Sequence, residues 1–239
     1  MKSSEFIVKR ITEIGDGVIF GYEDLRLPAD MQYAAAMTLC RMVANNQLRK
    51  VGKGRFYKPK VSRFGEMPPM PEQLLKDLLV KDGKLVGYIT GVPVFAQMGL
   101  TTQVSSKILI GSAQYHRPHQ RGGYMVAYTR QPNEITEMSI PILRILDAIK
   151  FIKEIPATTV EEAIVSIKNI IGQLSIPNLE NLILYALEYS ARTRAIVGAI
   201  LDLQNIDVAI LKQSLNPFTK YELPIGLSVL PNKDNWNIV

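Results

Sequence analysis

The sequence has little cysteine and histidine, with one cysteine and two histidines among 239 residues. A single cysteine excludes an internal disulfide, and therefore a disulfide-stapled secreted fold. The same scarcity of thiolate and imidazole ligands argues against a structural zinc site. No apolar run reaches the roughly 18 residues that a membrane span needs, and residues 1–5 lack the apolar core of a signal peptide. We therefore expect a cytoplasmic protein that does not contact a membrane.

The glycine motifs of nucleotide-binding proteins are also missing. Gly52-Lys53-Gly54 lacks the Walker spacing, and Gly15-Asp16-Gly17 is not followed by the Rossmann pattern. The chain also shows no internal repeat. From these absences we expect no catalytic residue, no metal and no cofactor.

Basic residues are present in excess, and they are unevenly distributed. The formal net charge is +6. Residues 1–64 hold twelve lysines and arginines against six acids, which accounts for the whole surplus, whereas residues 65–239 are neutral. A basic segment attached to a neutral body is typical of a nucleic-acid-binding module joined to a second domain.

The basic segment has the pattern of a small domain of helices and strands. In chain order the sequence predicts a helix with an apolar stripe at Ile7, Ile11 and Ile14, an extended run at 18–20, a helical turn at 22–25, a helix at 30–45 and a β-hairpin at 48–58. Asp30 is the expected N-cap of the long helix, and Gly52-Lys53-Gly54 forms the hairpin turn. This order is that of a winged helix-turn-helix, in which the third helix enters the major groove of DNA and the hairpin follows the backbone.

The side chains of this segment suit DNA. On the long helix, the stripe expected to face the core is Ala35, Leu39, Met42 and Val43, and the opposite side carries Tyr33, Met37 and Arg41, flanked by Ala34 and Thr38. The hairpin carries cations that can neutralise phosphates, namely Arg49, Lys50, Lys53, Arg55 and Lys58. Winged helices also serve as protein-interaction modules, which is the alternative interpretation. Cys40, inside the helix, is expected to be a small buried hydrophobe.

The rest of the chain predicts an α+β protein with four segments. The domain at 1–64 is followed by a proline-rich linker at 65–71, a mixed α/β domain at 72–155 and a helical region with an irregular tail at 156–239. Within the middle domain we expect helices at 72–80 and 91–98, strands at 84–90, 107–110 and 124–128, and a helix capped by Ser139. The C-terminal region should contain helices at 160–174, 179–190, 192–203 and 206–215. Glu161 and Glu162 are expected to stabilise the first turn of a helix electrostatically.

Three regions of the chain resemble the AbiEi-like antitoxins of abortive-infection (type IV toxin–antitoxin) systems. The most specific one is Gly87-Tyr88-Ile89-Thr90-Gly91 followed by Phe95-Ala96-Gln97-Met98-Gly99-Leu100-Thr101-Thr102-Gln103-Val104. Residues 39–43 and 48–59 look like the winged-helix end of that family, and residues 142–148 are similar to its later helix. The resemblance spans roughly residues 5–155.

This resemblance implies a DNA-binding antitoxin and transcriptional regulator of its own operon. The winged helix would bind the double-stranded operator, and the remainder would counteract a cognate toxin resembling a nucleotidyltransferase. No catalytic residue transfers, and the oligomeric state is not indicated. The DNA-contacting positions carried over by motif are Tyr33, Thr38 and Arg41 on the helix and Lys50, Lys53, Arg55 and Lys58 on the wing.

Two further groups of residues deserve an interpretation. An enzyme of nucleic-acid metabolism would need a carboxylate cluster with a metal, for which Glu134, Glu137 and Asp147 are the acids close enough in sequence. His116 and His119 lie in the polar segment 115–121, where Pro118 disfavours a helical ligand pair. We interpret that segment as a loop, and as a basic contact with a partner if it has a function.

Overall fold

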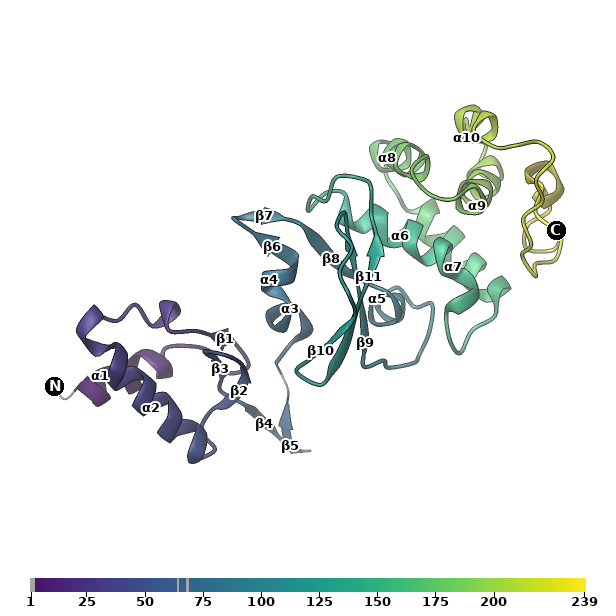
Figure 1. Cartoon of the computed structure of the whole chain (residues 1–239). Helices are drawn as coiled ribbons and strands as arrows, with labels where there is room; N and C mark the ends of the chain where they lie inside the picture. Colours follow the sequence, from purple (N-terminus) through teal and green to yellow (C-terminus); the bar gives the residue numbers. More distant parts are fainter. Residues whose placement is uncertain (1–2, 64, 68) are drawn as a thin grey trace. The chain divides into compact units, whose positions relative to one another are not determined.

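The computed structural model describes residues 3–63, 65–67 and 69–239 (Figure 1). The chain is a mixed α/β protein with several small sheets and a helical C-terminal region. It divides into two compact units. The first unit consists of Met1–Leu78 with Gln120–Gly123, and the second of Leu79–His119 with Tyr124–Val239.

The first unit follows the predicted order of elements. It contains α1 (Ser3–Thr12), β1 (Ile19–Phe20), the 3-10 turns η1 (Glu23–Leu25) and η2 (Ala29–Met31), α2 (Gln32–Ala44), β2 (Arg49–Gly52) and β3 (Arg55–Tyr57). The strands form an antiparallel sheet in the order β1-β3-β2. Gly54 adopts a φ of 68° in the hairpin turn, a conformation that glycine accepts without strain.

The core of this unit joins the apolar faces of α1 and α2 to the sheet. Ile7 and Ile11 are fully buried, as their helical spacing predicted, and they share one cluster with Leu39 of α2 and Phe56 of β3. The expected N-cap at Asp30 is wrong. Asp30 lies inside η2, and α2 begins at Gln32 without a side-chain cap, because the preceding 3-10 turn leads directly into the helix.

The segment expected to be a linker is largely structured. Strands β4 (Lys60–Ser62) and β5 (Gly65–Met67) pair as an antiparallel ribbon, and Pro68 lies outside the described residues. Two four-residue helices follow, α3 (Pro71–Leu74) and α4 (Lys76–Leu79), in place of the single helix expected at 72–80. The first unit therefore extends to Leu78, beyond the predicted boundary at residue 64.

The second unit combines a small sheet with helices. Its elements are β6 (Val80–Lys81), β7 (Lys84–Leu85), β8 (Gly87–Thr90), α5 (Val92–Gln97), β9 (Lys107–Ser112), β11 (Tyr124–Arg130), α6 (Ile140–Lys150) and η3 (Ile152–Glu154). Strand β10 (His119–Arg121) begins in this unit with His119, and its other two residues are counted with the first unit. The main sheet has the order β10-β11-β9-β8, with β9 and β11 parallel and β8 and β9 antiparallel. Strand β10 occupies part of the predicted loop. The strand expected at 84–90 is interrupted at Val86, whose N–H donates to the carbonyl of Leu79 instead.

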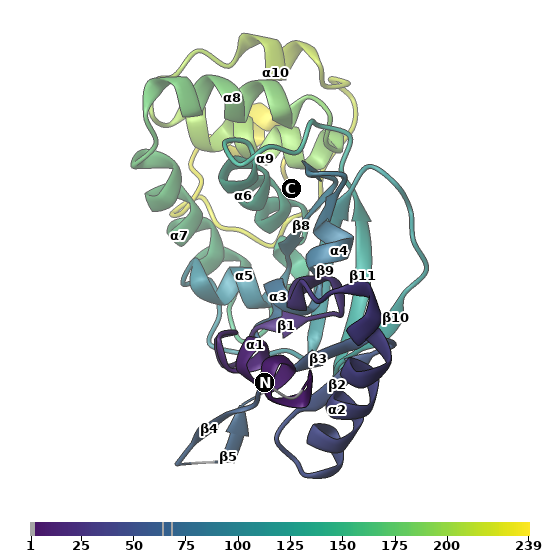
Figure 2. The ribbon, with the colours of Figure 1, turned by 90° about the vertical axis from the view of Figure 1, so that its left-hand side faces the viewer.

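The helical region contains the four predicted helices, but the second begins at Ile176 instead of residue 179, and the fourth has only five residues. It contains α7 (Val160–Gly172), α8 (Ile176–Ala186), α9 (Ala191–Asp202), α10 (Ala209–Gln213) and the 3-10 turn η4 (Lys233–Trp236). Figure 2 shows α6, α7, α8 and α9 gathered together, and their buried faces form one hydrophobic core. In the described residues, no helix combines the length and the apolar character needed to cross a membrane.

Two predicted helix starts have different outcomes. Thr159 and Glu162 form a reciprocal capping box at the start of α7, and the hydrogen bonds from Thr159 lower the pKa of the Glu162 carboxyl. Ser139 does precede α6, but its hydroxyl does not cap the helix. That hydroxyl donates to the carbonyl of Glu134 at 2.8 Å and accepts from the amide of Thr136.

Candidate nucleic-acid interface

Helix α2 presents one polar and aromatic face to solvent. Ala35 and Leu39 are fully buried, and the opposite side exposes 80% of Tyr33 and 51% of Met37. Arg41, one turn further along this face, is also exposed. The helical period therefore places Tyr33, Met37 and Arg41 together, as the sequence predicted.

Thr38 does not lie on this exposed face of α2. Its side chain is 7% exposed, and its hydroxyl donates to the carbonyl of Ala34 at 2.8 Å. A buried hydroxyl that already donates within its own helix is not placed to contact DNA, so the assignment of Thr38 to the contacting set is corrected. The reason is geometric: Thr38 lies beside Leu39 and Ala35, on the side of α2 that turns inward.

Cys40 is exposed, which contradicts the expectation of a small buried hydrophobe. It lies on the edge of the α2 face that carries Met37 and Arg41, because residue 40 follows the buried Leu39 by one helical step of about 100°. The sequence pattern placed the core stripe correctly but did not show that Cys40 falls just outside it.

A hollow of about 780 Å³ lies between α2, η1 and the β2–β3 hairpin. Its lining residues are Tyr22, Glu23, Cys40, Val43, Lys50, Lys53, Gly54, Arg55 and Phe56. Lys50 and Lys53 are exposed, and within the described part of the chain neither amine has an ion-pair partner. Two of the lining side chains are aromatic, and Tyr22 packs edge-on against Phe56 with ring centroids 6.1 Å apart. The hollow therefore combines an aromatic surface with two cations, Lys50 and Lys53, that have no ion-pair partner in the described residues.

Two other predicted cations are already neutralised by carboxylates. Arg49 binds both oxygens of Glu66, at 3.0 Å from Nε and 2.6 Å from Nη2. Lys58 pairs with Asp16 at 3.2 Å. Spacing alone does not reveal these partners, because Glu66 lies 17 residues after Arg49 in a stretch whose prolines indicated a linker.

Arg55 has a weaker ion pair than Arg49 and Lys58, whereas Lys50 and Lys53 have none in the described residues. Its guanidinium lies 3.9 Å from Asp77, a carboxylate that makes a shorter contact of 2.8 Å with Arg121. The long separation and the 38% exposure of both side chains leave Arg55 only loosely held. Of the five hairpin cations, Lys50, Lys53 and Arg55 are the ones that the fold leaves accessible at the hollow.

The acids proposed for a catalytic cluster do not converge. Asp147 is fully buried and accepts hydrogen bonds from Tyr88 at 2.7 Å and Tyr189 at 3.0 Å. Burial raises the pKa of the Asp147 carboxyl, against the lowering effect of the bonds from Tyr88 and Tyr189. Glu134 and Glu137 are exposed. Asp147 therefore belongs to a closed internal network, which Gln131 completes by donating to both tyrosine hydroxyls.

The histidines of the 115–121 segment pack on an aromatic ring. The ring centroid of His116 lies 4.8 Å from that of Tyr128, and the centroid of His119 lies 6.1 Å from it. Within the described ranges, no three histidine, cysteine or acidic side chains come together in a way that could hold a metal ion. His119 begins β10, so the predicted loop ends earlier than expected.

Comparisons with known proteins place the fold but not the activity. No protein-family model and no curated protein matches the chain. Among solved structures, the chain is similar to the crystal structure of the RV2827C protein from Mycobacterium tuberculosis, with a TM-score of 0.55 and 14% sequence identity. The match covers 93% of this chain and 85% of that chain. At this identity the likeness shows a common fold alone.

Proposed function

We propose that this chain is a DNA-binding antitoxin that represses transcription of its own toxin–antitoxin operon. The observation that supports DNA binding best is the exposed face of α2 beside a hollow lined by two cations, Lys50 and Lys53, that lack a partner in the described chain. In this proposal the first unit is a winged helix-turn-helix. Helix α2 enters the major groove, and the β2–β3 hairpin is the wing.

The dimensions and chemistry of α2 suit a major groove. Its 13 residues span about 20 Å, and the groove is about 12 Å wide, enough for one helix. Arg41 can donate to the O6 and N7 atoms of guanine, and Met37 can pack against a thymine methyl group. Tyr33 lies in the first turn of α2, the part of a recognition helix that contacts base edges.

The wing would supply the sequence-independent part of the affinity. Each phosphate neutralised by Lys50 or Lys53 releases condensed counterions, with a slope of about −0.9 in the logarithm of the binding constant against that of salt. Arg55 would add a third contact when phosphate displaces Asp77. Arg49 and Lys58 are not needed for this role, because each already has a carboxylate partner.

The antitoxin part of the proposal rests on the resemblance to AbiEi-like proteins. The segment that carries the Gly-Leu-Thr-Thr-Gln block includes α5 and the start of the loop that follows it. Residues 65–239 are neutral overall, which suits a protein partner better than a polyanion. The partner would be a nucleotidyltransferase-like toxin, and both proteins would act in the cytoplasm without a cofactor.

The direct test is titration of the full chain with DNA from upstream of its own gene, at several salt concentrations. The proposal expects a preference for that DNA over random sequence and a steep loss of affinity with salt. Equal affinity for both DNAs at physiological salt would contradict the repressor function. Co-purification with the product of a neighbouring nucleotidyltransferase-like gene tests the antitoxin function separately.

A protein-interaction module without DNA binding is the second candidate. The large exposed fractions of Tyr33 and Met37 favour it, because aromatic residues and methionine are enriched in protein interfaces. This candidate predicts that replacing Tyr33 and Met37 with alanine disrupts a protein complex, whereas replacing Lys50 and Lys53 leaves it intact. The DNA-binding proposal predicts that both pairs of replacements weaken the complex with DNA.

A further inference from the structure

The β4–β5 ribbon is an exposed element of the first unit that has no part in the proposed function so far. Figures 1 and 2 both show it projecting from the β1-β3-β2 sheet. All three residues of β5 are exposed, as are Lys60 and Val61 of β4, with 72% of Val61 accessible. A two-stranded ribbon of this length is not stable on its own in water. Its direction must therefore be set by contacts at its base.

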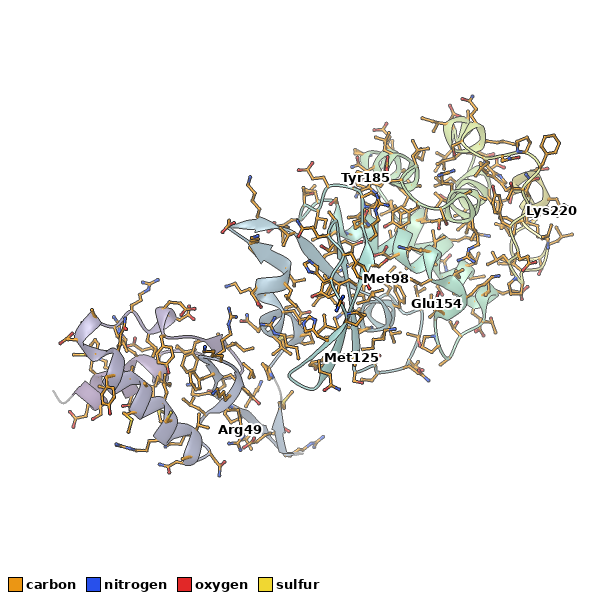
Figure 3. All side chains as sticks on the ribbon, viewed as in Figure 1. Arg49, Met98, Met125, Glu154, Tyr185 and Lys220 are labelled. Carbon is orange, nitrogen blue, oxygen red and sulfur yellow. The ribbon has the colours of Figure 1, made fainter. Side chains whose placement is uncertain are left out.

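The Arg49–Glu66 ion pair is such a contact. Arg49 on β2 donates two hydrogen bonds to the Glu66 carboxylate on β5, and its third nitrogen donates to Asn46 Oδ1 at 2.9 Å. Figure 3 labels Arg49 near the base of the ribbon. The two parallel bonds fix both distance and orientation, which a single contact would not do. We call this pair the Arg49–Glu66 clamp.

The register of the ribbon separates its two faces. Val61 is paired with Glu66, so these two side chains share the face that the clamp holds. Lys60 is paired with Met67, and Ser62 with Gly65, on the opposite face. Lys60 is exposed and, in the described chain, has no ion-pair partner. Arg49 neutralises Glu66, and the face of the ribbon that points away from the clamp carries one exposed cation, Lys60.

We propose that the β4–β5 ribbon is a second DNA-contacting element, and that Arg49 directs it through Glu66 instead of binding phosphate itself. Lys60 follows the cations of the β2–β3 hairpin by a few residues in the sequence, and a groove of DNA admits a two-stranded ribbon. Lys60 is the phosphate contact, and Arg49 is a positioning residue. This inference rests on the proposed DNA binding, and it reverses the role that the sequence indicated for Arg49.

The decisive variant is Glu66→Gln in the full chain, measured by fluorescence anisotropy with DNA from upstream of its own gene. Removing an acid should tighten DNA binding if only net charge matters. Loss of the clamp should instead weaken binding, by up to about fivefold, the factor that an exposed ion pair can supply. Glu72→Gln is the matched control, because Glu72 is exposed and has no ion pair in the described residues. It should leave binding unchanged or slightly tighter.

A charge exchange distinguishes positioning from direct contact. Arg49→Glu alone should weaken binding, and the double variant R49E/E66R should recover it, because the clamp is restored with opposite polarity. If Arg49 binds phosphate, the exchange does not recover affinity. Thermal unfolding of each variant separates these effects from a loss of folding.

Lys60→Ala provides the readout that a purely structural clamp would not change. It should reduce the salt slope by about 0.9 in the native chain, and by much less when Glu66→Gln has already misdirected the ribbon. Equal reductions in both backgrounds would overturn the inference, as would a Glu66→Gln variant that tightens binding as Glu72→Gln does. Native chain that binds no DNA would instead overturn the proposed function, and this inference with it.

Discussion

Arg49 on β2 binds Glu66 on β5 through two hydrogen bonds, of 3.0 and 2.6 Å. Lys50, the next residue, has no such partner in the described chain and lines the hollow beside α2. Two neighbouring cations of one strand therefore have different roles, because successive side chains of a strand point to opposite faces. The basic surplus of the first 64 residues is thus divided between internal ion pairs and cations that remain available for an anion.

Replacing Lys50 and Lys53 together with alanine should reduce the salt slope of DNA binding by about 1.8, because two phosphate contacts are lost. Affinity should fall for every DNA sequence to a similar extent. Lys58→Ala is the matched control, since Lys58 is paired with Asp16. Anisotropy titrations across a range of KCl concentrations measure the slopes. An equal reduction for Lys58→Ala would contradict the division between paired and available cations.

Replacing Arg41 with alanine should relax sequence preference. If Arg41 reads a base edge, the variant loses about 1–3 kcal/mol on its own upstream DNA and less on random DNA. Thr38→Val serves as the comparison, because the Thr38 hydroxyl is buried and bonded within α2. That variant should keep the native preference. Competition titrations with both DNAs test this, and an unchanged preference in Arg41→Ala would remove Arg41 from the base-reading set.

The buried Asp147 should make stability depend on pH in a defined direction. Its pKa is raised by burial, so the folded state keeps the proton at pH values where the unfolded state, with a pKa of about 3.9, has released it. The free energy of unfolding should therefore rise, relative to that of Asp147→Asn, as pH falls from the folded-state pKa towards about 4. Urea unfolding of both chains at a series of pH values measures the difference. Parallel curves would contradict this account of the network.

Gly198→Ala should detach the C-terminal tail. A Cβ at Gly198 would clash with the indole ring of Trp236, which is buried and donates to Asp202 at 3.0 Å. Overpacking of this kind costs about 1–3 kcal/mol. Because Trp236 is the single tryptophan of the sequence, its fluorescence should shift to the red. Gly172→Ala, whose Cβ would meet only an ordinary contact with Gln204, should leave the spectrum unchanged.

Local sequence patterns predicted most helices and strands. They did not predict contacts between residues that are distant in the sequence. The spacing of Ile7 and Ile11 and the apolar stripe of α6 identified helices, because one helical period determines which side chains are buried. The short strand β10 was missed, since a polar stretch of three residues carries no periodic signal. Its pairing with β11 depends on the sheet around it.

The candidate interface was predicted as a set of residues but not as a surface. The sequence indicated correctly that four of these side chains are exposed, namely Tyr33, Arg41, Lys50 and Lys53. The clamp on Arg49 and the ion pair of Lys58 depend on acids from other elements, Glu66 and Asp16, and their proximity follows only from tertiary packing. Cys40 is exposed although its neighbour Leu39 is buried. The periodicity of the sequence identifies the buried stripe of α2 but does not define the edge of that stripe to within one residue.

Cys40 offers the most direct test of DNA binding by α2 and the wing. It is the single cysteine of the sequence, it is exposed, and it lines the hollow with Lys50 and Lys53. The measurement is the rate at which a maleimide reagent modifies Cys40, with saturating upstream DNA and with no DNA. The account predicts that bound DNA slows the reaction by about tenfold or more. A tenfold decrease is expected when the thiol is accessible in only about a tenth of the molecules. An unchanged rate with DNA demonstrably bound would show that the nucleic acid lies elsewhere and would contradict the proposed interface.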